Sequence, residues 1–210
     1  MNEDFESYNI TDEEEVSGAE GRRYTMWRLV PLIMIMPTIG WEKVRENGPS
    51  PELAVIRFFL PLCLVAGASV FLAFLYPHQS GLAIEENKFT LLLVNSVIVF
   101  CSFFIGYYLA LVMQKIFLPK DMRGFPHTPF AKLLTLTGVA TLAIFHILFE
   151  ALPMLDSILV FLPLWTIFII FKGLQSAKIK SDKSLLAIGV VCIVVIAAPS
   201  LVKWVLILFT

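Results

Sequence analysis

The amino-acid sequence predicts an all-α integral membrane protein, a bundle of five transmembrane helices preceded by an interfacial amphipathic segment. Of its 210 residues, 58% are hydrophobic and 16% are charged, whereas an average soluble domain is about 45–50% apolar and about 25% charged. The hydrophobic residues also form runs close to the roughly 20 residues that cross ~30 Å of hydrocarbon. A third observation is that successive connections are alternately rich and poor in Lys and Arg, as expected of a chain that crosses a membrane repeatedly.

The region before the first span divides into two parts. Residues 1–23 contain eight acidic side chains and few apolar ones, so we expect a disordered cytoplasmic tail. Residues 24–50 are predicted to form an interfacial, amphipathic segment, because the apolar stretch Leu29–Ile39 is interrupted by two prolines and is too short to span. Trp27 and Trp41 flank this stretch and are predicted to anchor it at the membrane–water interface.

Residues 51–210 are predicted to form the transmembrane domain. Ser50-Pro51 and Thr128-Pro129 each combine a capping hydroxyl with a proline at the first helical position, a pattern typical of helix starts. The third and fourth spans are separated by only a few residues and should form a tight antiparallel hairpin. The expected spans lie at about 56–76, 89–113, 130–152, 157–172 and 184–209.

The basic residues predict the orientation. Fourteen of the sixteen Lys and Arg lie before or at the start of the first span or in the second and fourth connections, leaving Lys88 on the opposite side and Lys203 inside the fifth span. Since loops rich in Lys and Arg stay in the cytoplasm, the N-terminus is expected in the cytoplasm and the C-terminus outside. The basic loops can also attract anionic lipids, at about 1 kcal/mol per charge.

Four ionisable residues near the outer ends of the spans form a possible intramembrane polar cluster: His146, Glu150, Asp156 and Lys203. Ionisable groups within spans are costly and often functional. His146 and Glu150 are four residues apart and therefore share a helix face. One hypothesis is a buried Glu150–Lys203 pair or a proton-responsive His146–Glu150 site. The alternative is that Lys203 extends to the headgroups while Glu150 and Asp156 face water.

No catalytic triad, phosphate-binding glycine loop or metal-ligand spacing is present in the sequence. The three cysteines lie inside apolar runs and are interpreted as buried hydrophobic residues. A net charge of −1 does not favour nucleic-acid binding. The sequence therefore predicts a protein without enzymatic activity, cofactor or metal.

Several short motifs follow one another from Leu29 to Thr210. The segment Pro37-Thr-Ile-Gly-Trp41-Glu-Lys-Val precedes the first span, and the Pro-Ser-Pro-Glu-Leu segment of Pro49–Leu53 opens it. Gly106-Tyr107 lies in the second span, and Trp165–Leu174 ends the fourth before a basic loop. In order and spacing these motifs resemble the Yip1-domain family.

The resemblance implies a five-span bundle with a cytoplasmic N-terminal tail. Eukaryotic members are similar to trafficking factors that engage small GTPases at early secretory membranes, but their Asp-Leu-Tyr-Gly-Pro-type signature is absent from this sequence. The compact length and the Trp-Glu-Lys-Val element look more like bacterial members. The expected location is therefore the bacterial cytoplasmic (inner) membrane, with early secretory membranes as the alternative.

The leading hypothesis is a non-enzymatic membrane-organising, trafficking or assembly factor that acts through lipids, protein partners or a homo-oligomer. The alternative is a small transporter or channel subunit with a polar site near His146, Glu150 and Lys203. A transporter should have a continuous polar cavity at mid-depth, whereas an assembly factor should have a dry, packed bundle.

Overall fold

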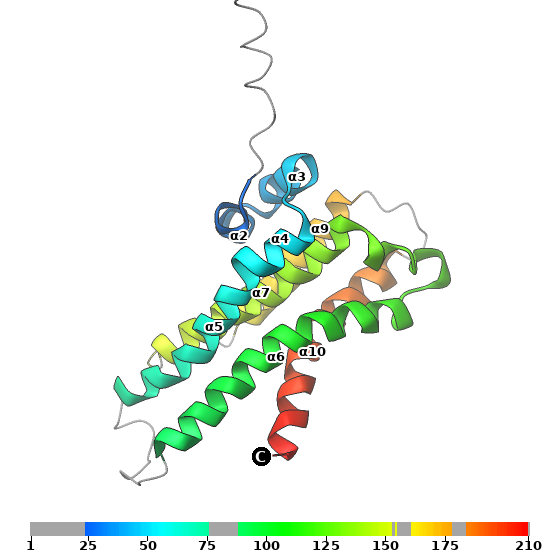
Figure 1. Ribbon diagram of the computed structural model, residues 1–210. Helices are drawn as coiled ribbons and strands as arrows, with labels where there is room; N and C mark the ends of the chain where they lie inside the picture. Colours follow the sequence, from blue (N-terminus) through cyan, green and yellow to red (C-terminus); the bar gives the residue numbers. More distant parts are fainter. Residues whose placement is uncertain (1–23, 76–87, 153, 155–160, 178–183, 210) are drawn as a thin grey trace, which may run out of the picture.

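The computed structural model describes residues 24–75, 88–152, 154, 161–177 and 184–209 (Figure 1). Every regular element in these ranges is helical. Four helices are long and apolar enough to cross a membrane: Pro51–Leu72, Phe89–Phe117, Pro129–Ala151 and Leu185–Leu208. The predicted tail, residues 1–23, and Asp156 lie outside the described residues.

The first of the four helices is irregular near its start. The Ser50 hydroxyl accepts a hydrogen bond from the Leu53 N–H at 3.4 Å and Pro51 is the first helical residue, so the predicted start is confirmed. A π-helical turn follows and ends two residues before Pro61. The segment consists of α4 (Pro51–Ala54), η1 (Val55–Phe59), α5 (Leu60–Ser69) and the 3₁₀ turn η2 (Val70–Leu75).

The remaining long elements run back and forth along the bundle (Figure 1). Thr128 caps α7 by accepting the Ala131 N–H at 3.2 Å, which confirms the second predicted helix start. The elements are α6 (Lys88–Phe117), two short turns η3 (Lys120–Met122) and η4 (Phe125–His127), α7 (Pro129–Ala151), α9 (Leu162–Ser176) and α10 (Ser184–Leu208).

The centre of the bundle is α7, which packs against α5, α6, α9 and α10. Each residue from Leu133 to Thr141 is buried. Glycines permit the closest helix contacts: Gly138 lies against Val195 of α10, and Gly106 of α6 lies directly against the backbone of Pro199. Small residues at such crossings let helix backbones approach closely, which favours association between helices in lipid.

A pair of short helices, α2 (Met26–Ile35) and α3 (Pro37–Asn47), covers one end of the bundle (Figure 1). The two helices meet where Gly40 approaches Ile33. Met26, Leu29, Val30 and Ile33 of α2 are buried and belong to the main hydrophobic core. The N-terminal segment is therefore packed into the fold through a substantial apolar contact of its own.

The structure corrects the expectation that Trp41 anchors the N-terminal segment at the membrane–water interface. Its side chain is fully buried within the protein and is not exposed at the surface. Its indole N–H donates a 2.9 Å hydrogen bond to the Ile169 carbonyl of α9. Gly173, one turn further along α9, leaves the space that the indole fills. An aromatic residue with basic neighbours is typical of a side chain that lies among lipid headgroups. Trp41 is buried instead, because the packing of α3 on α9 places its indole in an apolar interior.

Two further indoles join the N-terminal pair to the bundle. Trp27 is 53% exposed, so an interfacial role stays a prediction, and its N–H donates to the Arg57 carbonyl at 3.2 Å. That carbonyl lies four residues before Pro61, which has no N–H to offer it, so the indole replaces the missing helical partner. Trp165 of α9 donates to the Met34 carbonyl at 2.9 Å, near the end of α2 where carbonyls lack helical donors.

Candidate functional site

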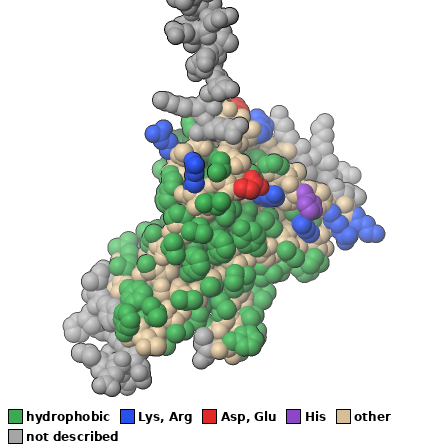
Figure 2. All heavy atoms as spheres, viewed as in Figure 1, with side chains coloured by type: hydrophobic (Ala, Val, Ile, Leu, Met, Phe, Trp, Pro, Cys, Tyr) green, Lys and Arg blue, Asp and Glu red, His purple; other side chains and the backbone are tan. Residues whose placement is uncertain are grey.

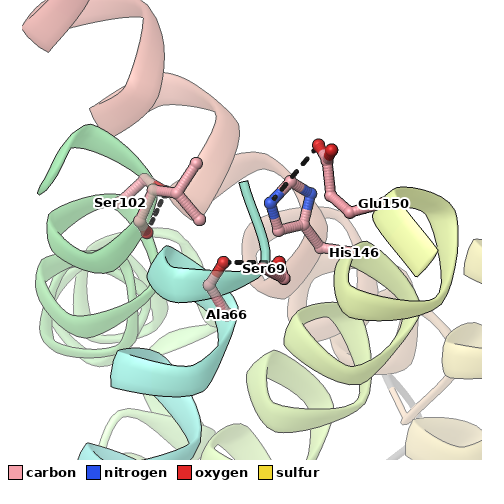
Figure 3. Close-up of polar contacts among 6 residues, drawn as sticks. Ala66, Ser69, Ser102, His146 and Glu150 are labelled. Atoms are coloured by element: carbon pink, nitrogen blue, oxygen red, sulfur yellow. Dashed lines mark hydrogen bonds and ion pairs between the residues drawn. The ribbon is translucent and has the colours of Figure 1, made fainter. Parts of the chain in front are cut away.

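The polar cluster predicted at the outer ends of the spans is partly assembled (Figure 3). His146 and Glu150 project from α7 toward one another, with His146 Nε2 4.0 Å from Glu150 Oε1. Their side chains are 20% and 31% exposed, so the pair lies at the edge of the protein interior. Lys203 lies on α10, which packs against α7. Asp156 lies outside the described residues, and the Glu150–Lys203 pair stays a prediction.

The hydroxyl groups nearest this cluster are hydrogen-bonded within their own helices. Ser69 donates to the Ala66 carbonyl at 2.7 Å, and Ser102 donates to the Val99 carbonyl at 2.8 Å (Figure 3). Such local bonds satisfy a hydroxyl without requiring a partner on another helix. The two serines therefore do not extend the cluster into a hydrogen-bonded chain across the bundle.

The chemistry open to the pair is exchange of a proton between imidazole and carboxylate. At 4.0 Å the two atoms are too far apart for a direct hydrogen bond, and His146 Nε2 is buried with no hydrogen-bond partner among the described residues. The imidazole ring also packs on Phe103, with ring centroids 5.8 Å apart. Within the described ranges no three His, Cys, Asp or Glu side chains are placed to hold a metal ion.

A second site, which the sequence analysis missed, is a groove of about 300 Å³ between α4, η1, α6 and the first turn of α7. Glu52 and Lys132 form an ion pair in its wall, with Lys132 Nζ 3.7 Å from Glu52 Oε1. Tyr107 and Tyr108 of α6 line the groove beside them. The sequence contains both the Pro49–Leu53 and the Gly106-Tyr107 motifs, and this was the one indication of the groove. Nothing in the sequence shows that the two motifs lie side by side in the fold.

A larger cavity of about 510 Å³ lies between the end of α3, η4, the start of α7 and the end of α9. Its lining includes Arg45, Phe125, Thr128 and Ala177. Both cavities occupy the end of the molecule covered by α2 and α3. Charged side chains gather toward that end, whereas hydrophobic side chains cover the rest of the visible face (Figure 2).

The chain matches no protein-family model, no curated protein and no solved structure. The short motifs singled out in the sequence meet in pairs in the fold. Trp41 packs against Gly173, and Glu52 shares a groove with Tyr107. Each motif thus contributes to a contact between helices that are distant in sequence.

Proposed function

We propose that this chain is a five-span, Yip1-like membrane protein that acts as a non-enzymatic organising or assembly factor. Its basic end, defined as the end that carries α2, α3 and both cavities, would engage protein or lipid partners. The observation that carries the proposal is the contrast between a densely packed middle and the cavities and charges at one end.

The packed middle favours an assembly factor over a transporter. Leu136, Val139 and Ala140 of α7 are fully buried, as is Ile170 of the facing α9. Transporters of known type place polar groups and broken helices around a site near the bilayer midplane. Here Thr141 donates to the carbonyl one turn earlier in its own helix, and the buried Thr137 hydroxyl has no hydrogen-bond partner among the described residues, so the two do not form a polar chain.

Three features support five spans. The fifteen residues of α9 extend about 23 Å at 1.5 Å per residue, most of the ~30 Å hydrocarbon core. Leu164, Ile167 and Phe168 lie exposed on α9, as expected of a helix in contact with lipid. The described chain also begins at the basic end, whereas α10 ends at the other (Figure 1). In this arrangement α2 and α3 form an interfacial cap.

The topology is tested with a C-terminal reporter. Five crossings and a cytoplasmic N-terminus predict that a C-terminal alkaline phosphatase is active and a C-terminal green fluorescent protein is dark. Four crossings would reverse both results. Cysteines introduced singly at positions 29–39 should resist impermeant thiol reagents added from outside, and labelling from that side would contradict the interfacial cap.

The function is tested by affinity purification of the full-length chain from native membranes, with identification of bound proteins and lipids. The double variant Lys43→Gln/Arg45→Gln, which removes two charges from α3, should lose the partners. The matched variant Lys203→Gln, which removes a charge from the opposite end, should retain them. A chain that purifies without any partner, or loses partners equally in both variants, would count against the proposal.

The transporter alternative is favoured by the buried and unpartnered Nε2 atom of His146 beside Glu150. Proteoliposomes that contain a pH-sensitive dye distinguish the two functions. We expect the purified chain to leak protons no faster than empty liposomes. A leak that Glu150→Gln abolishes would favour the transporter.

A further inference from the structure

The groove beside α6 contains an unused hydrogen-bonding group. Tyr107 is only 2% exposed, yet it lines the groove, and no residue that the structure describes hydrogen-bonds its hydroxyl. Its ring is held firmly, 5.4 Å from Phe59 and 4.9 Å from Tyr108 between centroids. The hydroxyl oxygen itself is not among the buried unpartnered atoms, so it opens on the groove and can donate a hydrogen bond to water or to a ligand.

The same groove presents both signs of charge. Glu52 and Lys132 come from the starts of different helices, and their side chains remain 69% and 36% exposed although they lie 3.7 Å apart. Both charged groups therefore remain accessible to a ligand, although they form an ion pair. A ligand with one anionic and one cationic group could contact both without disturbing the pair, whereas a purely anionic ligand would also face the Glu52 carboxylate.

Around these polar groups the groove is apolar and faces outward. Val55, Ile56 and Leu111 line it, and Ile56 is 64% exposed. On α6, Ile105 is also exposed one turn farther from the basic end than Tyr108. The polar groups therefore adjoin an apolar surface that continues along the bundle, as a headgroup adjoins its acyl chains.

We propose that this groove binds the headgroup of a phospholipid that carries a phosphate and a primary ammonium, of the phosphatidylethanolamine type. Lys132 and the Tyr107 hydroxyl donate to the phosphate, and the Glu52 carboxylate accepts from the ammonium. The acyl chains lie along Ile56 and Ile105. A volume of about 300 Å³ suits a headgroup rather than a whole lipid. The inference rests on the proposed function, because it takes the basic end to lie at the headgroup level.

The experiment uses the full-length chain in detergent, titrated with phosphatidylethanolamine, phosphatidylcholine and phosphatidylglycerol of identical acyl chains. Bound lipid is counted by native mass spectrometry. The wild-type chain should bind the ethanolamine lipid about fivefold or more tightly than the other two, as one or two extra charge-assisted hydrogen bonds would give. Tyr107→Phe, which keeps the ring, and Lys132→Gln should each weaken that binding about fivefold.

Glu52→Gln should remove the preference for the ethanolamine lipid over phosphatidylglycerol. The matched controls are Tyr24→Phe and Lys115→Gln, which delete a hydroxyl and a charge at the same end but outside the groove. Both should bind as the wild-type chain does. Equal affinity for the three lipids, unchanged binding in the Tyr107 and Lys132 variants, or equal losses in Lys132→Gln and Lys115→Gln would each overturn the inference.

The Tyr107→Phe chain is also used in the partner purification described above. Loss of lipid preference together with retained protein partners supports the inference. Absence of any lipid preference in a wild-type chain that still captures its partners overturns the lipid site alone and leaves the proposed function standing. In a third outcome, the chain captures no partners and yet prefers the ethanolamine lipid, with the expected losses in the Tyr107 and Lys132 variants. That result supports the lipid site and contradicts the assembly role.

Discussion

The contact between Trp41 and Gly173 should contribute strongly to the attachment of the N-terminal helix pair. Trp41→Phe removes a buried 2.9 Å hydrogen bond to Ile169, at about 1 kcal/mol, and part of a fully buried ring, at about 1–2 kcal/mol more. The expected cost is about 2–3 kcal/mol. In a chain of this length that corresponds to a fall of roughly 5–10 °C in the thermal unfolding midpoint.

Gly173→Ala changes the other residue of the same contact. An added Cβ would lie 2.8 Å from Trp41 Cε2 and would also meet Leu134 Cδ1. The leucine methyl can rotate away, but the indole is rigid and fully enclosed, so the expected cost is about 1–3 kcal/mol. Phe lacks the part of the indole that the new methyl would strike. The double variant should therefore be less destabilised than the sum of the single ones, by about 1 kcal/mol or more.

The assay is thermal unfolding of the four purified chains in one detergent, monitored by intrinsic fluorescence and by circular dichroism. Trp204→Phe and Gly189→Ala provide the control cycle, since Trp204 is 64% exposed and, apart from the glycine's own stretch of helix, no atom of the described residues lies within 4 Å of a Cβ at Gly189. Those two changes should be mild and additive within about 0.5 kcal/mol. Additivity within the same margin in the Trp41 and Gly173 cycle would refute the packing argument.

Two further predictions concern other helix contacts. Gly106→Ala should lower the unfolding midpoint, because the new Cβ would lie 2.8 Å from the Pro199 Cα and backbone cannot move aside as a side chain can; Gly189→Ala is again the neutral control. Thr135→Val should lower the free energy of unfolding by about 1–3 kcal/mol, because the fully buried Gln114 amide nitrogen loses the hydroxyl to which it donates at 2.9 Å. The amide oxygen of Gln114 already has no partner among the described residues. Gln114→Leu, measured in the same unfolding assay, should be nearly neutral, and equal losses in both variants would contradict this asymmetry.

The starts of the long helices were predictable because they depend on neighbouring residues. Ser50 and Thr128 each cap a helix that opens with proline, as their local sequence indicated. The apolar character of the four span-length helices was equally readable, since it depends on composition alone. The shorter α9 did not reach that length within the described residues, so the fifth span remains a proposal.

The candidate sites were less predictable because they combine distant residues. His146 and Glu150 could be paired in advance, since a spacing of four residues places them on one face of a helix. The groove of Glu52, Tyr107 and Lys132 could not be predicted, because its parts come from three helices. A sequence indicates each helix separately but not which faces meet.

The physical reason lies in the uniform hydrophobicity of these helices. Soluble helices show an apolar stripe that identifies their buried face, but α6 is apolar around its whole circumference and exposes Val97 and Ile105 while it buries Val99 and Phe103. The amino-acid sequence by itself determined that the chain is helical, apolar enough for a membrane and charged in alternate connections. Only the tertiary structure decided which sides of the helices are exposed and which pack against other helices. It was this packing that buried Trp41 against α9 and formed the groove beside Tyr107.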